Sequence, residues 1–121
     1  MKKRYTISAL CFDRAGICIS HGNNSYTKTH PLQKYFAEKV GQPEKQYLHA
    51  EIQALIHAKE HQVYEISIYH YDRFGRPLDG KPCPICIEAM KAFGVKKVSY
   101  TTKNGWIYGK TPEEMASTST N

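Results

Sequence analysis

The chain has 121 residues, of which 40% are hydrophobic and 23% are charged, and its formal net charge is +6. This length fits a single domain, and the composition is that of an ordinary globular fold. No apolar run approaches the ~20 residues that cross a bilayer, and no apolar signal core follows the basic N-terminus. We therefore expect a cytoplasmic protein with no membrane partner, and the positive charge suits a nucleotide or a nucleic acid.

The predicted elements follow the order β-β-α-α-β-α-β-β. Residues rich in β-branched and aromatic side chains, bounded by turn signals, predict strands at 4–12, 17–20, 64–71, 96–102 and 106–108. Apolar spacing with Pro or Gly near the ends predicts helices at 31–40, 49–61 and 84–93. A polar loop is expected at 22–30, another loop at 73–80, a single domain over 1–116, and a disordered tail at 117–121.

The predicted strands alternate between apolar and polar residues. Ile66 and Ile68 alternate with Glu65 and Ser67, whereas strands that are covered on both faces read as continuous apolar runs. We therefore expect an α/β fold in which helices cover mainly one face of the sheet. The other face is then exposed or meets a second copy, so a homo-oligomer is expected.

Four cysteines are present, and two of them form a C-x-x-C pair, Cys83 and Cys86, at the start of a predicted helix. Free N–H groups and the positive end of the helix dipole favour thiolates there, and this spacing puts both sulfurs on one face. Cys11 and Cys18 lie roughly opposite each other in the first hairpin and are interpreted as small buried thiols. A catalytic zinc needs a third protein ligand, and His49 also opens a helix.

Glu51 stands two residues after His49. On a regular helix, positions two apart point in very different directions, so the two side chains share a centre only where the chain enters the helix. A carboxylate at a catalytic zinc can take a proton from water and return it to a leaving amine.

His49-Ala50-Glu51 followed by Pro82-Cys83-Pro84-Ile85-Cys86 has the form H-x-E … P-C-x-x-C, the signature of zinc nucleobase deaminases. From the first hairpin to about Thr102, the sequence resembles the cytidine and deoxycytidylate deaminase family of the cytidine deaminase-like superfamily. The resemblance implies a three-layer-like α/β fold with a central mixed sheet of about five strands.

The resemblance also implies the site residues. One Zn²⁺ is expected on His49, Cys83 and Cys86, with Glu51 carrying the proton. The segment Gly22-Asn23-Asn24 is similar to the family's Gly-x-Asn, so Asn24 is expected to hold the substrate. Further candidate substrate contacts are Ala50, Pro82 and Tyr71, and Tyr26 and Phe74 also lie on segments that lead into the site.

The implied activity is hydrolytic deamination of cytosine in a free nucleoside or nucleotide, with deoxycytidylate favoured. Cytosine or adenine in single-stranded DNA or RNA, including transfer RNA, stays open as a second substrate class. The second zinc-binding motif of some deoxycytidylate deaminases is absent, and the stretch before Pro82 is longer than in the transfer-RNA adenosine deaminases.

The same residues allow four other interpretations. The cysteine pair could be a redox pair, which leaves His49 and Glu51 without a role, or part of a closed structural zinc site with Cys11 or another histidine. The segment 57–61 matches H-x-x-E-H, a metalloprotease pattern, but leaves the cysteines unexplained. A non-catalytic module that kept the fold would not need Glu51.

Overall fold

The computed structural model describes residues 5–118. The strands are β1 (Tyr5–Phe12), β2 (Cys18–Asn23), β3 (Glu65–Asp72), β4 (Lys97–Thr102) and β5 (Gly105–Lys110). The helices are α1 (Pro31–Lys39), α2 (Ala50–His57), α3 (Pro84–Ala92) and α4 (Pro112–Thr118).

One mixed sheet contains all five strands in the order β2-β1-β3-β4-β5. β1 pairs antiparallel with β2 and β3, and β5 pairs antiparallel with β4, whereas β3 and β4 are parallel. A parallel pair needs a crossover connection, and α3 lies in the segment that supplies it. The expected α/β fold with a central mixed sheet of five strands is therefore confirmed.

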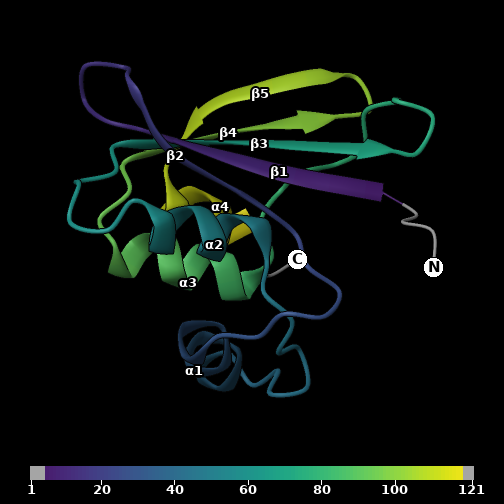
Figure 1. Ribbon diagram of the computed structural model, residues 1–121. Coiled ribbons are helices and arrows are strands. Elements are labelled where there is room, and N and C mark those ends of the chain that lie inside the picture. Colours follow the sequence, from purple (N-terminus) through teal and green to yellow (C-terminus); the bar gives the residue numbers. More distant parts are fainter. Residues whose placement is uncertain (1–4, 119–121) are drawn as a thin grey trace.

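All four helices lie on the same side of the sheet (Figure 1). α2 packs against β1 and β2, and α1 lies below α3, so the order is sheet, inner helices and outer helix. The core is apolar and fully buried between the sheet and the inner helices; its largest members include Ile52, Leu55, Ile66, Ile68 and Met90. The expectation that helices cover mainly one sheet face is confirmed.

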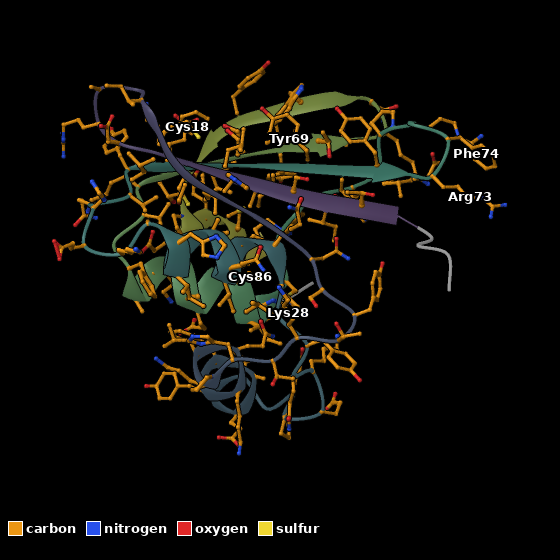
Figure 2. The ribbon with its side chains drawn as sticks, viewed as in Figure 1. Cys18, Lys28, Tyr69, Arg73, Phe74 and Cys86 are labelled. Atoms are coloured by element: carbon orange, nitrogen blue, oxygen red, sulfur yellow. The ribbon has the colours of Figure 1, made fainter. Side chains whose placement is uncertain are left out.

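No helix of the described chain covers the other face of the sheet (Figure 1). Tyr69 and Cys18 lie on this side, away from the helices (Figure 2). The Tyr69 ring meets Trp106 edge to face at 4.8 Å, and Trp106 stacks with Tyr108 at 6.0 Å. The expectation that a second copy meets this face stays a prediction.

The first hairpin differs from the expected one. β2 is longer and takes in Gly22 and Asn23, and a register shift between Cys11 and Phe12 places Cys18 opposite Phe12. As a result Cys11 is buried among the core side chains while Cys18 is exposed, so the expected pair of buried thiols is wrong for Cys18.

The last helix, α4, is not among the expected elements. The Thr111 Oγ accepts a hydrogen bond from Glu114 N at 3.0 Å, and the Glu114 carboxylate accepts one from Thr111 N at 2.8 Å. This reciprocal pair is a capping box, with Pro112 directly after the cap. Ser117 and Thr118, which fall in the expected tail, belong to this helix, and residues 119–121 lie outside the described residues.

α2 ends at His57, short of the expected end, because Lys59 takes a positive φ of 55° and the chain turns. Tyr35, an aromatic residue of α1, is 57% exposed and lies outside the buried face of this helix. Within residues 5–118, no helix combines the length and the hydropathy required to cross a bilayer.

Candidate active site

Two helix N-termini meet at the site. His49 is the N-cap residue of α2, and Cys83 is the N-cap residue of α3. Neither side chain hydrogen-bonds to the first turn of its own helix, as an N-cap side chain commonly does. Both are therefore available to bind something else, and Pro84 at the first turn of α3 fixes the direction in which the chain leaves Cys83.

The three predicted metal ligands converge. His49 Nδ1 lies 3.3 Å from Cys86 Sγ and 3.5 Å from Cys83 Sγ, and all three atoms lie within 4.8 Å of one another. Tetrahedral zinc with Zn–S near 2.3 Å and Zn–N near 2.05 Å requires an N–S separation of about 3.6 Å. The donor types and the spacing therefore fit a zinc ion held by three side chains.

Within residues 5–118, no other group of three or more His, Cys, Asp or Glu side chains is close enough to share a metal ion. The H-x-x-E-H segment makes no such site: His57 Nδ1 contacts the His21 carbonyl at 2.8 Å, and His61 Nδ1 contacts the Ala58 carbonyl at 3.1 Å. Cys11 is not near the three ligands either, so the closed four-ligand and protease interpretations find no support.

Of the three ligand side chains, only Cys83 has a lowered pKa. A hydrogen bond from Cys86 lowers the pKa of the Cys83 thiol to about 4, in spite of burial. Burial raises the pKa of Cys86 well above its usual value. Burial acts to lower the pKa of His49, but the hydrogen bond and charge of Cys83 outweigh it and raise that pKa. This cluster already favours one thiolate, the form that binds zinc.

Glu51 lies in the first turn of α2, and its side chain is only 6% exposed. Burial raises the pKa of this carboxyl to about 7, with the charge of Cys83 acting in the same direction. Glu51, His49 and Cys83 line the same cavity, so the carboxyl lies beside the metal ligands without belonging to the three-atom cluster.

The cavity has a volume of about 500 Å³, within the usual range for a small-molecule site. Asn24 and Ala50 line it, as the sequence predicts. The side-chain oxygen of Asn24, Oδ1, accepts a hydrogen bond from Ile7 N at 3.0 Å. This bond fixes the side-chain amide and leaves its NH₂ group to donate elsewhere. Asn23 does not line the cavity; its side chain accepts from Ser8 Oγ at 2.8 Å.

Two predicted substrate contacts do not line the cavity. Pro82 is buried, and Tyr71 pairs with Thr6 across β1 and β3. Successive side chains in a strand point to opposite faces, so it is the neighbouring His70, not Tyr71, that lines the cavity. His70 Nδ1 also contacts the Asp79 carbonyl at 2.9 Å.

A buried glutamine supports the site without having been predicted. Gln33, on α1, is fully buried; its carbonyl oxygen accepts from His49 N at 3.1 Å, and its amide nitrogen donates to the Lys45 carbonyl at 3.0 Å. It ties the outer helix to both ends of the segment that leads into α2. The available signal was a glutamine between two apolar positions of the predicted helix, Leu32 and Phe36.

Gly22 brings β2 into close contact with α2. A Cβ at this position would lie 2.5 Å from the Ala50 carbonyl oxygen and 2.6 Å from Ala54 N. The Ser20 hydroxyl adds a hydrogen bond of 2.7 Å to the Ala54 carbonyl. Strand and helix therefore touch backbone to backbone next to the residues that enter the site.

A five-stranded mixed sheet carrying one His and two Cys at two helix N-termini defines a zinc-site α/β domain of the deaminase type. The family model for the cytidine and deoxycytidylate deaminase zinc-binding region matches residues 2–102, so the chain belongs to this family. No curated protein matches the chain.

Among the solved structures that match this chain are two cytidine deaminases. A cytidine deaminase mutant from Mycobacterium tuberculosis is 15% identical with a TM-score of 0.51, and the match covers 93% of this chain and 77% of that one. A cytidine deaminase from Mycobacterium leprae is 20% identical with a TM-score of 0.49, and the match covers 94% of this chain and 77% of that one.

Proposed function

We propose that this protein hydrolyses the exocyclic amino group of cytosine in a free nucleoside or nucleotide, with deoxycytidylate as the favoured substrate. The observation that carries the proposal is the place of a buried carboxyl, Glu51. It lines a cavity of about 500 Å³ together with His49 and Cys83, two of the three side chains that converge as candidate zinc ligands. Bound there, zinc supplies Lewis-acid activation of water near neutral pH.

In this proposal Glu51 is the proton carrier. It accepts a proton from the attacking water and delivers it to the amino group, which leaves as ammonia while the ring carbon keeps the oxygen. A carboxyl with a pKa raised to about 7 by burial exchanges protons readily in both directions near neutral pH. The buried setting also keeps other water away from the reacting atoms.

Asn24 is the proposed orienting residue. Its amide oxygen is already held by Ile7 N, so its NH₂ group is directed by the fold to donate to a carbonyl or hydroxyl of the substrate. Besides Glu51, the cavity lining includes two lysines, Lys45 and Lys81, and two further acids, Glu44 and Asp79. Cationic and carboxylate groups at one cavity suit a nucleotide, which presents both a phosphate and sugar hydroxyls.

Ammonia release by the zinc-loaded protein tests the proposal. The panel contains cytidine, deoxycytidine, their monophosphates, and single strands of DNA and RNA that contain C or A. We expect turnover of the monophosphates, and a loss of at least about a hundredfold in Glu51→Gln, because a positioned acid–base group contributes about 10²–10⁴-fold.

The matched control is Glu60→Gln, which changes an exposed carboxylate that follows α2 and does not line the cavity. Zinc per chain is measured in both variants, so that lost activity is separated from a lost site. Full turnover by Glu51→Gln would contradict the assigned role, and turnover of single strands alone would overturn the choice of a free nucleotide.

A further inference from the structure

A rigid hairpin tip extends one wall of the cavity. We name residues 72–77 the Arg-Phe loop. The strand that leads into it carries His70, and the segment that leaves it carries Asp79 and Gly80, all of which line the cavity. The two sides are joined by hydrogen bonds from Leu78 N to the His70 carbonyl at 2.8 Å and from Asp72 N to the Arg76 carbonyl at 2.9 Å.

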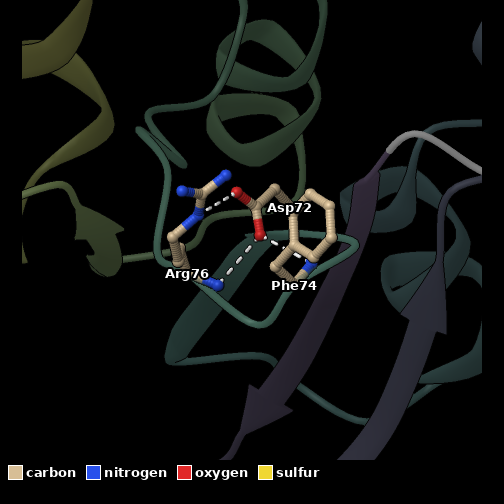
Figure 3. Close-up of polar contacts among 3 residues, drawn as sticks. All are labelled: Asp72, Phe74 and Arg76. Carbon is tan, nitrogen blue, oxygen red and sulfur yellow. Dashed lines mark hydrogen bonds and ion pairs between the residues drawn. The ribbon is translucent and has the colours of Figure 1, made fainter.

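Asp72 holds the loop in one conformation. Its carboxylate accepts hydrogen bonds from Phe74 N at 2.8 Å, Arg76 N at 3.0 Å and Arg76 Nε at 2.8 Å (Figure 3). Gly75 takes a φ of 81°, and its N–H donates to the Asp72 carbonyl at 3.0 Å, which closes the turn. A loop that is ordered in advance loses little entropy when a ligand binds to it.

The tip presents an exposed aromatic ring with two cations close to it. Phe74 is 68% exposed, and the guanidinium carbons of Arg73 and Arg76 lie 4.9 Å and 5.2 Å from the centre of its ring. Arg73 and Phe74 project from the end of the hairpin (Figure 2). Arg76 is paired with Asp72, whereas Arg73 makes no ion pair within the described chain.

This chemistry fits a single strand of nucleic acid. Unstacked bases stack on aromatic rings and on guanidinium planes, and arginines pair with the phosphates between them. The same loop of a second copy is the poorer partner for this surface, because it would bring Arg73 and Arg76 against the same two cations.

The loop is also within reach of the reacting base. Phe74 lies four residues beyond His70, and at ~3.3 Å per residue the tip is at most about 13 Å along the hairpin from the cavity lining. A short run of extended strand can therefore have one cytosine in the cavity and a neighbouring base on the loop.

We propose that the Arg-Phe loop binds the nucleotides that flank a target cytosine in single-stranded nucleic acid, so that the cavity accepts a base within a strand as well as a free nucleotide. The catalytic part of this inference rests on the proposed deaminase function, whereas the binding part does not. Phe74 is the stacking platform, Arg73 pairs with a phosphate, and Asp72 is a positioning residue.

The binding test uses the full zinc-loaded chain with Glu51→Ala, so that no turnover occurs. The probe is a short fluorescein-labelled DNA strand with one cytosine flanked by thymines, and anisotropy gives its Kd over a series of potassium chloride concentrations. We expect Phe74→Ala to weaken binding about tenfold and Phe74→Trp to restore it, since base–aromatic stacking is worth ~1–3 kcal/mol per base. Arg73→Ala should reduce the slope of log K against log salt by about 0.7.

Tyr108→Ala is the matched control, because this tyrosine is 74% exposed and lies on β5, outside the loop and the cavity lining. Equal binding by the parent and Phe74→Ala, an equal loss in Tyr108→Ala, or no binding by the parent would each overturn the proposal.

In the active background, we expect Phe74→Ala to lower the ratio of kcat/KM on the strand to kcat/KM on deoxycytidylate by about tenfold. An unchanged ratio would also count against the loop. If the active protein deaminates neither substrate while the anisotropy results hold, the proposed function fails and the binding surface stands.

Discussion

Replacing Gly22 by alanine tests the link between the sheet and the active site. The new Cβ would lie 2.5 Å from the Ala50 carbonyl oxygen, and separations under 3.0 Å are essentially never seen for a real Cβ. The atoms in the way belong to the backbone of α2, so the strand or the helix must move by at least about 0.5 Å. That is about the tolerance within which a catalytic constellation must be held.

We expect Gly22→Ala to lower the free energy of unfolding by about 1–3 kcal/mol, which is the usual cost of overpacking. We also expect it to lower kcat/KM by up to about 10²-fold, because the movement of α2 displaces His49 and Glu51. Urea unfolding, zinc per chain and deamination of deoxycytidylate measure the three consequences.

Gly16→Ala is the control for this experiment. No atom lies within 4 Å of the added Cβ, but φ is +85°, so the variant pays backbone strain of about 1–2 kcal/mol far from the site. We expect it to lose stability and keep its kcat/KM. Wild-type kcat/KM in Gly22→Ala would refute the claim that this contact sets the position of α2.

Two further predictions concern thiols and the Arg-Phe loop. In the native zinc-loaded protein, the exposed Cys18 should react rapidly with a thiol-specific disulfide reagent, whereas Cys11 should not. Burial raises the pKa of Cys11 to about 11, which leaves roughly one thiolate in a thousand at pH 8. Fast labelling of the Cys18→Ser variant would contradict the protection of Cys11. Asp72→Ala should speed amide hydrogen exchange at Phe74 and Arg76. In the wild type, the exchange at these two amides should also become faster as the pH falls through the pKa of Asp72, which the hydrogen bond from the Arg76 backbone N–H lowers. Protection that does not change with pH, after correction for intrinsic exchange rates, would show that the Asp72 carboxylate does not hold the loop.

The metal ligands could be predicted from the sequence because each stands at a helix start that local signals reveal. Pro84 after Cys83 and the apolar spacing after His49 predict the two N-termini, and their residue types match zinc. What the sequence did not contain was the distance between the helices, which depends on Gly22 and on the tertiary packing that it permits.

Details that depend on strand register were harder to predict. One extra residue in the first hairpin moves Cys18 to the exposed position, and strand alternation puts His70 rather than Tyr71 at the cavity. On α1, residues advance by about 100° each, so Tyr35 falls outside the buried arc that Gln33, Phe36 and Ala37 occupy. The α4 capping box, by contrast, was present in the sequence as Thr111 and Glu114.

The separation of the ligands along the chain gives the metal site a second role. His49 and Cys83 are 34 positions apart, so an ion that binds both cross-links the chain and closes a loop in the unfolded state. In the chain-entropy treatment used for disulfides, a cross-link over such a loop is worth about 3–4 kcal/mol. Cys83 and Cys86 share one helix, so either thiolate can keep the loop closed with His49, and His49 is the single ligand whose loss opens it. The His49 imidazole is therefore the ligand on which this stabilisation of the fold depends most, whereas loss of one cysteine can be compensated in part by the other.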